Sequence, residues 1–253
     1  MLNQERRREI LELLQSDGRV LVGDLARKFR TSLITIRKDL ELLHQQGQLE
    51  RTHGGALPLR TGALVDQSLR EKERMHRRQK ALIAAAAARM IRPGQVIVLD
   101  SGTTTTAIAR ACRQMRSLTV ITNATNIAAE LADTSVEVVL TGGSLRKNSF
   151  SLVGPLAEES LRKLNADVLF LAVDGFDVHY GLTTPNLLEA RVNRAMSECS
   201  RRTIVVCDSS KFGRHSLSLI MDMSSVHETI TDRDISKRDL KALRAGKIEV
   251  TLV

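Results

Sequence analysis

A run of small and hydroxyl-bearing residues near the middle of the chain has the composition of an anion site. The apolar segment Val96–Leu99 is followed by Asp100, Ser101, Gly102, Thr103 and Thr104, and the next residues have helical spacing. Glycine lets the backbone approach a ligand, and the first turn of a helix presents free N–H groups beside the Thr hydroxyls. An ordinary capped helix start has the same pattern, so both interpretations stay open. No Lys follows as in a P-loop, and nucleotide hydrolysis is not indicated.

Polar residues also follow four other strand-like segments. These segments are Leu118–Ile121, Val136–Leu140, Val168–Val173 and Thr203–Val206. The residues that follow them include Asn123, then Gly142 and Gly143 with Arg146, then Asp174 and Gly175, and finally Asp208 with Lys211. Small residues, donors, a carboxylate and two cations on one rim favour a phosphorylated, hydroxyl-rich small molecule. Individually, Asn123 and Asp174 could cap helices or turns, and Arg146 and Lys211 could be solvated.

The alternation of these strands with amphipathic stretches sets the expected fold. It predicts an α/β domain with a mostly parallel sheet and helices on both faces. Ligands of such sheets bind beyond the carboxyl ends of the strands, where the polar residues stand. We therefore expect an effector domain over residues 81–253.

The first fifty residues have a different pattern, that of three short helices. Apolar residues including Ile10 and Leu14 mark the first helix, and Asp24–Phe29 forms the second. Ser32 is the expected N-cap of a third helix, which ends at Gly47. The segment Gln48–Leu59, with its Gly-Gly pair, predicts a hairpin beside this helix.

The third helix is expected to present a face suited to DNA. Its core face is marked by Ile36, Leu40 and Leu43, and a turn of about 100° per residue places Ile34 and Lys38 opposite, flanked by Thr35 and Arg37. Arg and Lys donate to guanine, Thr bonds base edges, and Ile contacts a thymine methyl. Arg51 and His53 would lie on the hairpin. A packing module without a DNA role is the alternative interpretation.

Charge is distributed unevenly along the chain, with a basic N-terminal segment, the head (residues 1–80), and a nearly balanced remainder, the body (residues 81–253). Residues 1–80 hold 17 Lys and Arg and 11 Asp and Glu, whereas residues 81–253 hold 21 and 18. A basic segment can bind a polyanion or can simply be a solvated charged surface, and charge alone does not decide between the two. The helical pattern of the head has to decide. We expect a DNA-binding domain over residues 1–58 and a polar linker over residues 59–80, which is a loop to about Gln67 and then helical.

Other classes of protein are not indicated. The longest apolar run, residues 81–88, is too short for a membrane span, and no secretory signal follows the arginines near the start. We therefore expect a cytoplasmic protein without membrane contact. Three separated cysteines, Cys112, Cys199 and Cys207, favour reduced buried thiols over a disulfide frame or a zinc site, and no cofactor is predicted.

The head resembles the winged helix-turn-helix of DeoR-type bacterial regulators. The resemblance is carried by Leu25-Ala26, Phe29, Ser32, Thr35-Ile36-Arg37-Lys38-Asp39-Leu40, Gly47 and His53-Gly54-Gly55-Ala56. It implies that Ser32, Ile34, Thr35, Arg37, Lys38, Arg51 and His53 contact double-stranded operator DNA. Two departures stand out: Arg30-Thr31 replaces the usual turn residue and Val, and Lys38 replaces the commoner second Arg. Lys lacks the bidentate contact that Arg makes with guanine.

The body resembles the effector domain of the same family, which is similar to sugar-phosphate isomerases and amino-sugar-phosphate deaminases. The matching motifs are Asp100-Ser-Gly-Thr-Thr, Thr122-Asn123, Thr141-Gly-Gly-x-x-Arg146, Asp174-Gly175, Glu189-Ala190 and Asp208-Ser-Ser-Lys211. Carried over, Ser101, Gly102, Thr103, Thr104 and Lys211 would hold phosphate, and Asp100, Asn123, Asp174 and Glu189 would meet the sugar. Gly181–Thr184 and Glu189–Asn193 look most like members that sense amino-sugar phosphates.

The resemblance leaves an enzyme as the rival class. An isomerase or deaminase would use Asp174 and Glu189 as acid and base. In the deaminases a His follows the Asp-Gly pair, whereas Phe176 stands here and cannot transfer a proton. The head favours a regulator instead, most simply a repressor that responds to a phosphorylated sugar and works as a homodimer or larger homo-oligomer.

Overall fold

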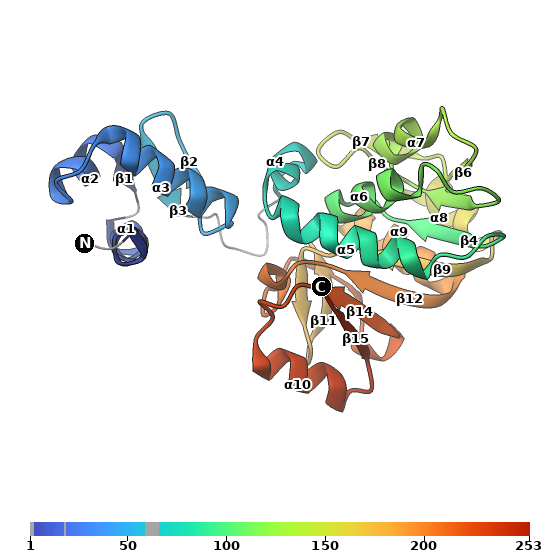
Figure 1. The fold of residues 1–253 in the computed structure, drawn as a ribbon. Helices are drawn as coiled ribbons and strands as arrows, with labels where there is room; N and C mark the ends of the chain where they lie inside the picture. The colour runs from blue at the N-terminus through green and yellow to red at the C-terminus, as the bar shows by residue number, and fades with distance from the viewer. Residues whose placement is uncertain (1–2, 18, 59–65) are drawn as a thin grey trace. The chain divides into compact units, whose positions relative to one another are not determined.

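The computed structural model describes residues 3–17, 19–58 and 66–253 of the chain (Figure 1). Leu59, the last residue of the expected hairpin, and residues 60–65 of the expected linker lie outside this description. The described residues form two compact units. The first contains the chain to residue 58 together with Arg74–His76, and the second contains residues 66–73 and Arg77–Val253.

The first unit is a three-helix domain with a small antiparallel sheet. Its elements are α1 (Asn3–Asp17), β1 (Val20–Leu21), α2 (Val22–Lys28), α3 (Leu33–Gln45), β2 (Leu49–Arg51) and β3 (Gly55–Pro58). The strands lie in the order β1-β3-β2. Ile10, Ile36 and Leu40 are fully buried in its core. The three predicted helices and the hairpin are confirmed, whereas β1 was not expected from its two residues.

The ends of α2 and α3 follow from two local interactions. Ser32 is the N-cap of α3, as predicted: its Oγ accepts a hydrogen bond from the Thr35 N–H at 3.1 Å. Arg30, in the turn between α2 and α3, has a φ of 48°, in the left-handed region that disfavours a side chain. The turn residue at which this sequence departs from the family therefore adopts the conformation that glycine favours.

The second unit is built around one seven-stranded sheet. Its helices are α4 (Leu69–Arg74), which extends one residue beyond the unit, α5 (Arg77–Met90), α6 (Thr103–Cys112), α7 (Thr125–Leu131), α8 (Pro155–Arg162), α9 (Leu187–Glu198) and α10 (Lys237–Ala245), with 3-10 turns η1 (Ser209–Lys211) and η2 (Met223–Ser225). The sheet contains β4 (Val96–Leu99), β5 (Thr119–Thr122), β6 (Glu137–Leu140), β9 (Ala166–Leu171), β12 (Ser200–Val206), β14 (Glu228–Thr231) and β15 (Glu249–Leu252). Every pairing in it is parallel, which confirms the predicted α/β class.

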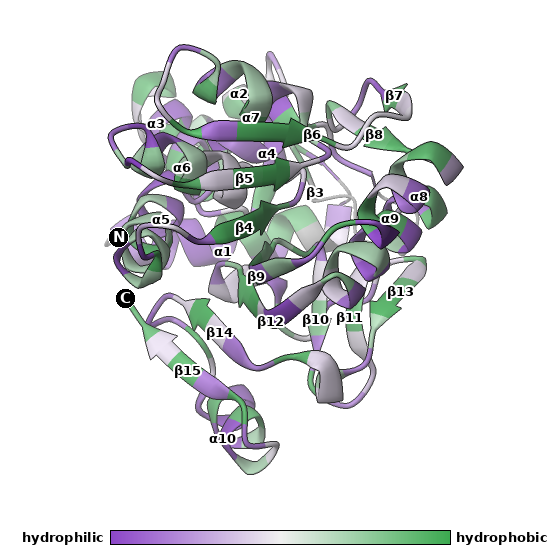
Figure 2. Cartoon of the chain, turned by 90° about the vertical axis from the view of Figure 1, so that its right-hand side faces the viewer, coloured by the Kyte–Doolittle hydropathy of each residue, from purple (hydrophilic) through white to green (hydrophobic). Residues whose placement is uncertain are grey.

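Helices cover both faces of this sheet because the side chains of its central strands alternate. Buried residues of α5, α6 and α7 cluster with Ile97, Leu99 and Phe170. Those of α8, α9 and α10 cluster with Val98, Leu169 and other residues of the opposite face. The hydrophobic colouring of β4 and β5 in Figure 2 reflects strands that are buried on both faces.

The strand order fixes where a ligand crevice can form. The order is β15-β14-β12-β9-β4-β5-β6, so the chain winds one way from β4 to β6 and the other way from β9 to β15. The reversal falls between β4 and β9. Ligands of open α/β sheets bind beyond the carboxyl ends of the strands at such a reversal, which here means beside Asp100 and Asp174.

Two smaller antiparallel pieces stand outside the main sheet. One is the hairpin of β7 (Ser144–Arg146) with β8 (Ser151–Val153), and the other is the sheet of β10 (Gly175–Asp177), β11 (Gly181–Thr184) and β13 (Ser218–Met221). Neither was expected from the sequence, because each of these short strands begins with Gly or Ser and none is a continuous apolar run like β4. Each piece directly follows predicted ligand-binding residues: β7 comes after Gly142 and Gly143, and β10 comes after Asp174.

The second unit differs from the expectations in two boundaries and in two additional strands. The strand predicted over Val168–Val173 is β9, which ends at Leu171 because the Ala172 N–H donates to the Asp100 side chain instead of a neighbouring strand. Strands β14 and β15 were not expected, since their sequences contain buried or half-buried polar residues. The helix predicted after Gln67 is interrupted between α4 and α5, where His76 has a φ of 50°.

The left-handed residue Arg30 generates a stability prediction. Arg30→Gly should stabilise the first unit by about 1 kcal/mol, because it removes the steric cost of a Cβ at positive φ. Arg30→Ala, which removes the charge and keeps the Cβ, is the control and should not stabilise it. Denaturant-dependent hydrogen exchange of the first unit's amides measures both, and equal stabilisation by the two variants would contradict the steric explanation.

Candidate functional site

The outer face of α3 is exposed, as its pattern predicted. Ile34 has an exposed fraction of 65%, and Arg37 and Lys38 are also exposed. Thr35 is half-buried, and its hydroxyl lies 2.9 Å from the Ser32 Oγ that caps the helix. An apolar side chain and two cations thus stand together on one rigid helix face.

A buried ion-pair cluster holds α1 against α3. Asp39 is buried, and its two carboxylate oxygens lie 2.6 Å from the Arg6 Nε and 2.8 Å from the Arg7 Nε. Arg6 is itself buried. These two arginines belong to the basic excess of the head, yet the structure uses them to brace α3, and sequence reasoning did not separate them from DNA-contacting charge.

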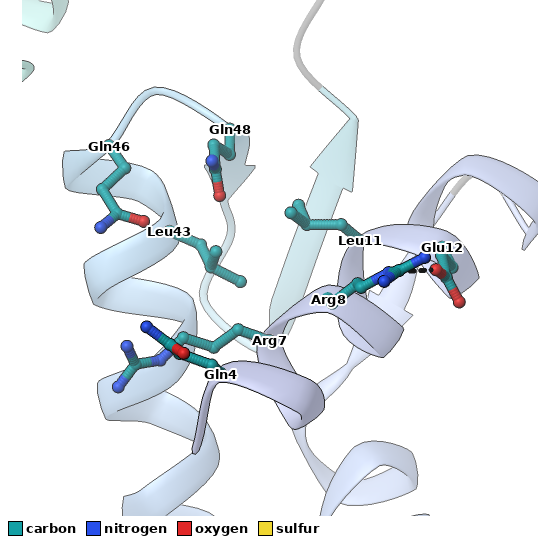
Figure 3. Close-up of a pocket in the computed structure, with 8 residues that line it drawn as sticks. All are labelled: Gln4, Arg7, Arg8, Leu11, Glu12, Leu43, Gln46 and Gln48. Carbon is teal, nitrogen blue, oxygen red and sulfur yellow. Dashed lines mark hydrogen bonds and ion pairs between the residues drawn. The ribbon is translucent and has the colours of Figure 1, made fainter. Parts of the chain in front are cut away.

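A hollow beside this cluster is lined mostly by polar and charged side chains, with two leucines among them (Figure 3). Its walls are formed by Gln4, Arg7, Arg8, Leu11, Glu12, Leu43, Gln46 and Gln48. Arg8 donates to Glu12 across one helical turn at 3.0 Å. None of the predicted DNA-binding residues lines the hollow, which marks the seam between α1 and the end of α3.

The predicted wing residues differ in their surroundings. Arg51 forms an ion pair through its Nη1 with Glu41 of α3, and hydrogen bonds from Arg51 and Gln45 hold the pKa of Glu41 below its ordinary value. His53 lies in the turn between β2 and β3 and is exposed. The Arg51 pair fixes the wing to α3, and a DNA contact by Arg51 stays a prediction.

The turn after β4 is shaped by packing as well as by its chemistry. A Cβ at Gly102 would lie 2.5 Å from the Cβ of Ala172, so glycine is required where β4 and β9 come close. The Gly102 N–H donates to the Thr105 hydroxyl, which donates in turn to the Asp100 carbonyl. Ser101 and Thr103 are half-buried at the start of α6, and Thr104 is buried.

Asp100 bridges the two strands at the reversal of strand order. Its Oδ1 accepts the Ala172 N–H at 3.0 Å, and the residue is buried. Burial raises the pKa of Asp100 to about 7, and the nearby negative charges of Glu189 and Asp174 add to the rise. The carboxyl group therefore changes its charge near neutral pH.

Arg146 and Glu189 meet across the rim. The Arg146 Nη1 donates to the Ser149 hydroxyl at 2.8 Å and to the Glu189 Oε1 at 3.1 Å. The same Glu189 oxygen accepts a hydrogen bond from the Ser151 hydroxyl at 3.0 Å. The Arg146 Nη2 pairs with Asp66, from the segment that the sequence assigned to the linker.

Asp174 is the meeting point of two lysines. Its Oδ1 lies 2.5 Å from the Lys72 Nζ and 4.0 Å from the Lys211 Nζ. Burial opposes ionisation of this carboxyl group, but the Lys72 and Lys211 charges outweigh it and hold its pKa below the ordinary value. The Thr184 hydroxyl links the two carboxylates, since it lies 3.5 Å from Asp174 and 3.4 Å from Glu189.

A third lysine lies next to this group. Lys80 of α5 is buried and donates its Nζ to the backbone carbonyl of Lys72. Burial lowers the pKa of Lys80 to about 8, an effect that Asp208 opposes and that Lys211 and Lys72 reinforce. Asp66, Lys72 and Lys80 were missed as site residues because the sequence offered only a polar linker there.

Asn123, Gly142 and Gly143 hold the neighbouring turns. Asn123 is fully buried, and its Nδ2 donates to the Leu152 carbonyl at 3.1 Å while its Oδ1 has no partner among the described residues. Gly142 and Gly143 have φ values of 74° and 116°, and a Cβ at Gly143 would lie 2.7 Å from the Val153 carbonyl oxygen. Ligand contact by these three residues stays a prediction.

Of the predicted rim carboxylates, Asp100 bonds to the Ala172 N–H and stands outside the network of the others. The structure joins the predicted residues Arg146, Glu189, Asp174 and Lys211 in that network. It runs from Arg146 through Glu189 and Thr184 to Asp174, Lys72 and Lys211. Carboxylates that accept sugar hydroxyls and ammonium groups that attract phosphate are adjacent in it. The position that would need a proton-transferring side chain is occupied by Phe176, which is fully buried and stacked on Phe212 with ring centroids 4.5 Å apart.

Within the described ranges, neither a metal centre nor a membrane span is found. No group of three or more His, Cys, Asp or Glu side chains there is arranged to hold a metal ion. No helix in this part of the chain is long and apolar enough to cross a membrane. Cys112 and Cys207 are buried and Cys199 is half-buried, each with a free thiol.

Comparisons with known proteins match both units. Residues 6–61 match the DeoR-like helix-turn-helix domain, and residues 75–233 match the DeoR C terminal sensor domain. The chain is 42% identical to a putative aga operon transcriptional repressor of Escherichia coli O157:H7, over 98% of this chain and 93% of the relative. It is 38% identical to the HTH-type transcriptional regulator GlpR of Haloferax volcanii, over 99% and 98%.

Among solved structures, a D-ribose-5-phosphate isomerase in complex with phospho-erythronic acid is similar over 54% of each chain. The TM-score is 0.41 and the sequence identity is 14%. The overlap is partial and the identity is low, so the family assignment rests on the two domain matches and the two sequence relatives.

The buried Asp100 generates a prediction about pH. Its raised pKa means that the folded state binds a proton more tightly than the unfolded chain, so the wild type should gain stability as pH falls from above 7 towards 4. Asp100→Asn keeps an acceptor for the Ala172 N–H and removes the charge. At pH 8 the variant should therefore be more stable than the wild type, on the order of a few kcal/mol.

Denaturant unfolding at a series of pH values measures this difference. The advantage of Asp100→Asn should shrink between pH 8 and pH 5, while Asp133→Asn, at an exposed carboxylate, should show no such advantage. Parallel pH profiles for wild type and Asp100→Asn would show that Asp100 does not titrate in this range.

Proposed function

This chain belongs to the DeoR family of DNA-binding transcriptional regulators, and from that premise we propose that it represses a sugar-catabolism operon and leaves its operator when a phosphorylated sugar or amino sugar binds. The observation that carries the proposal is the charged network of Arg146, Glu189, Asp174 and Lys211 at the strand-order reversal of the second unit. A regulator needs such a ligand site in the same chain as a DNA-reading helix.

The DNA contacts in this proposal come from α3 and the wing. Ile34, Arg37 and Lys38 would enter the major groove, with Ile34 on a thymine methyl and the cations on guanine acceptors. Ser32 and Thr35 lie at the start of the helix, where contacts to phosphate or base edges are available. Arg51 and His53 would contact the DNA backbone from the wing.

The effector contacts come from the rim. Ser101, Gly102, Thr103 and Thr104 at the start of α6, together with Lys211, would hold the phosphate. Asp100, Asn123, Asp174 and Glu189 would accept or donate hydrogen bonds to the sugar, with Arg146, Gly142 and Gly143 forming one wall. The resemblance through Gly181–Thr184 and Glu189–Asn193 favours an amino-sugar phosphate.

The same proposal includes assembly and location. A two-fold homodimer, or a larger homo-oligomer, would present two copies of α3 to a pseudo-palindromic operator at fixed spacing. Because the protein would act on operator DNA, the proposed location is the cytoplasm. The Escherichia coli relative is named as an operon repressor, which supports repression as the direction of control.

The alternative of an enzyme is not favoured. The chain belongs to a family of regulators, and both sequence relatives reported above are named as regulators or repressors. In this proposal the carboxylates Asp174 and Glu189 bind hydroxyl groups of the effector. Each is held in ion pairs, which suits binding more than proton transfer.

Lys38 tests the DNA-binding face. Lys38→Ala should weaken binding to the specific operator by about 1 to 3 kcal/mol and leave binding to unrelated DNA nearly unchanged, if the residue reads a base. Fluorescence anisotropy with DNA from upstream of the gene, at one stated salt concentration, measures both affinities. Lys163→Ala, at the exposed lysine that directly follows α8, is the control. A uniform loss on all DNA would instead make Lys38 a phosphate contact.

Lys211 tests the effector site. In the same assay, a panel of hexose, pentose and amino-sugar phosphates should include a compound that lowers operator affinity of the wild type. Lys211→Ala should abolish this response and leave operator affinity intact, because the ammonium group is assigned to the phosphate. Lys241→Ala on α10 is the matched control. A normal response in Lys211→Ala would refute the assignment.

A further inference from the structure

The chain between Glu73 and Asp100 has basic side chains and no acidic ones. Residues 74–99 contain no Asp or Glu, and their cations are Arg74, Arg77, Arg78, Lys80, Arg89 and Arg92. Helix α5 (Arg77–Met90) occupies most of this stretch. The function proposed above uses none of the exposed cations of this helix.

Four of these arginines lie on the surface of the protein. Arg77, Arg78, Arg89 and Arg92 are exposed, whereas Lys80 is buried on the inner side of α5. The step from Arg78 to Arg89 is close to three helical turns, so these two residues lie on nearly the same line of the helix. The helical rise places them about 16 Å apart along that line.

The guanidinium groups of these four arginines are not neutralised by neighbouring acids. None of them forms an ion pair with a described residue, and Arg77 donates its Nε to the neutral backbone carbonyl of Glu73 at 3.4 Å. Acidic groups just before the helix have other partners, since Asp66 pairs with Arg146 and Glu73 pairs with Arg110. The surface of α5 therefore keeps its positive charge.

Small side chains separate the cations on this helix. Ala81 and Ala85 are exposed on the same face of α5, between Arg78 and Arg89, with Leu82 at the edge of that face. Alanines let a broad partner come close to the helix, so that both arginines can donate to its oxygens. A length of about 16 Å matches roughly five base pairs of DNA, over which one strand presents several phosphates.

The chain connects this helix directly to the DNA-binding unit. His76, which clusters with the first unit, donates its N–H at 3.3 Å to the carbonyl of Gln45, the last residue of α3. Arg77, the first residue of α5, is the next residue in the chain. A duplex held by the first unit thus brings a high local concentration of phosphate groups to α5.

We propose that the exposed face of α5 and the turn after it, with Arg77, Arg78, Arg89 and Arg92, form a second DNA-binding surface that contacts the phosphate backbone beside the bases read by α3. The inference goes beyond the proposed function, which places every DNA contact in α3 and the wing, and it rests on that function for the duplex itself. Guanidinium groups bind phosphodiester oxygens without reading the base sequence. The surface therefore adds affinity for DNA of any sequence.

The salt dependence of DNA binding by the full chain tests this surface. Each phosphate contact steepens the slope of log K against log salt concentration by about 0.9. Arg78→Gln/Arg89→Gln should therefore flatten the slope by about 1.8 per bound subunit and weaken binding at least tenfold at about 0.1 M salt. Fluorescence anisotropy should show an equal loss on DNA from upstream of the gene and on an unrelated duplex of the same length.

Two matched variants control for charge and for position. Arg78→Lys/Arg89→Lys keeps both cations and should keep the slope of the wild type. Arg238→Gln/Arg244→Gln removes two exposed arginines from α10, on the opposite face of the sheet, and should also keep it. A flattening below about 0.9 per bound subunit in the α5 variant would overturn the inference. Equal flattening by the α10 variant would overturn it as well, because net charge would then set the affinity.

A comparison with Lys38→Ala in the same assay separates this inference from the proposed function. An unchanged slope in the α5 variant, together with an operator-specific loss in Lys38→Ala, would overturn the inference and leave the DNA-binding face of α3 standing. A flattened slope in the α5 variant with no effect of Lys38→Ala would support the inference and overturn the role of Lys38. Salt-independent binding by the wild type would overturn both.

A measurement on the wild type keeps the test independent of the folding of the variants. Modification of arginines by a limiting amount of phenylglyoxal, read by mass spectrometry, should be slowed at least fivefold at Arg78 and Arg89 by a saturating amount of the unrelated duplex. The rate at Arg238 should not change. Equal rates at Arg78 and Arg89 with and without the duplex would refute the surface.

Discussion

The hydrogen bond from the Ala172 N–H to the Asp100 carboxylate joins the two halves of the parallel sheet at their carboxyl ends. Strand β4 leads to β5 and β6 on one side, and β9 leads to β12, β14 and β15 on the other. The loops that carry the predicted ligand-binding residues leave the sheet on either side of this junction. The spacing of those loops therefore depends on it. Gly102 is required at the same place, since any side chain there would collide with Ala172.

The charges at the rim are arranged so that each supports the others. Glu189 is buried, and Arg146, Ser151 and Thr184 satisfy its oxygens. Asp174 shares the Thr184 hydroxyl and is neutralised by lysines instead of an arginine. A buried charge without partners would be costly, so removing one member of this network disturbs the next. A ligand that replaces one partner therefore changes the whole chain of contacts.

The sequence pattern predicted those helices and strands that are stabilised by a nearby capping residue or by a regular apolar repeat. The apolar runs gave β4 with its bounds, and Ser32 gave the start of α3, because burial on both faces and a side-chain cap leave direct marks in a sequence. Strand β14 escaped notice because Glu228 and Thr229 are buried by pairing with β12 and β15, which only the fold supplies. Lys72 and Asp66 escaped for the same reason: their partners are about 80 to 100 residues away in the chain.

Neighbouring residues on α3 show why basic composition alone does not identify a DNA-binding surface. Lys38 and Asp39 are adjacent, but the rotation of the helix from one residue to the next points them in different directions. Lys38 is exposed, whereas Asp39 is buried against Arg6 and Arg7. Those two arginines share one buried carboxylate and hold α1 in place, so they count among the positive residues of this unit without lying on the outer face of α3. Affinity for DNA is set by the cations that remain unneutralised on the exposed face, and orientation by the helix that carries them. The ion pairs of Asp39 thus contribute to recognition indirectly, by keeping Arg37 and Lys38 on a helix that cannot rotate away from its core.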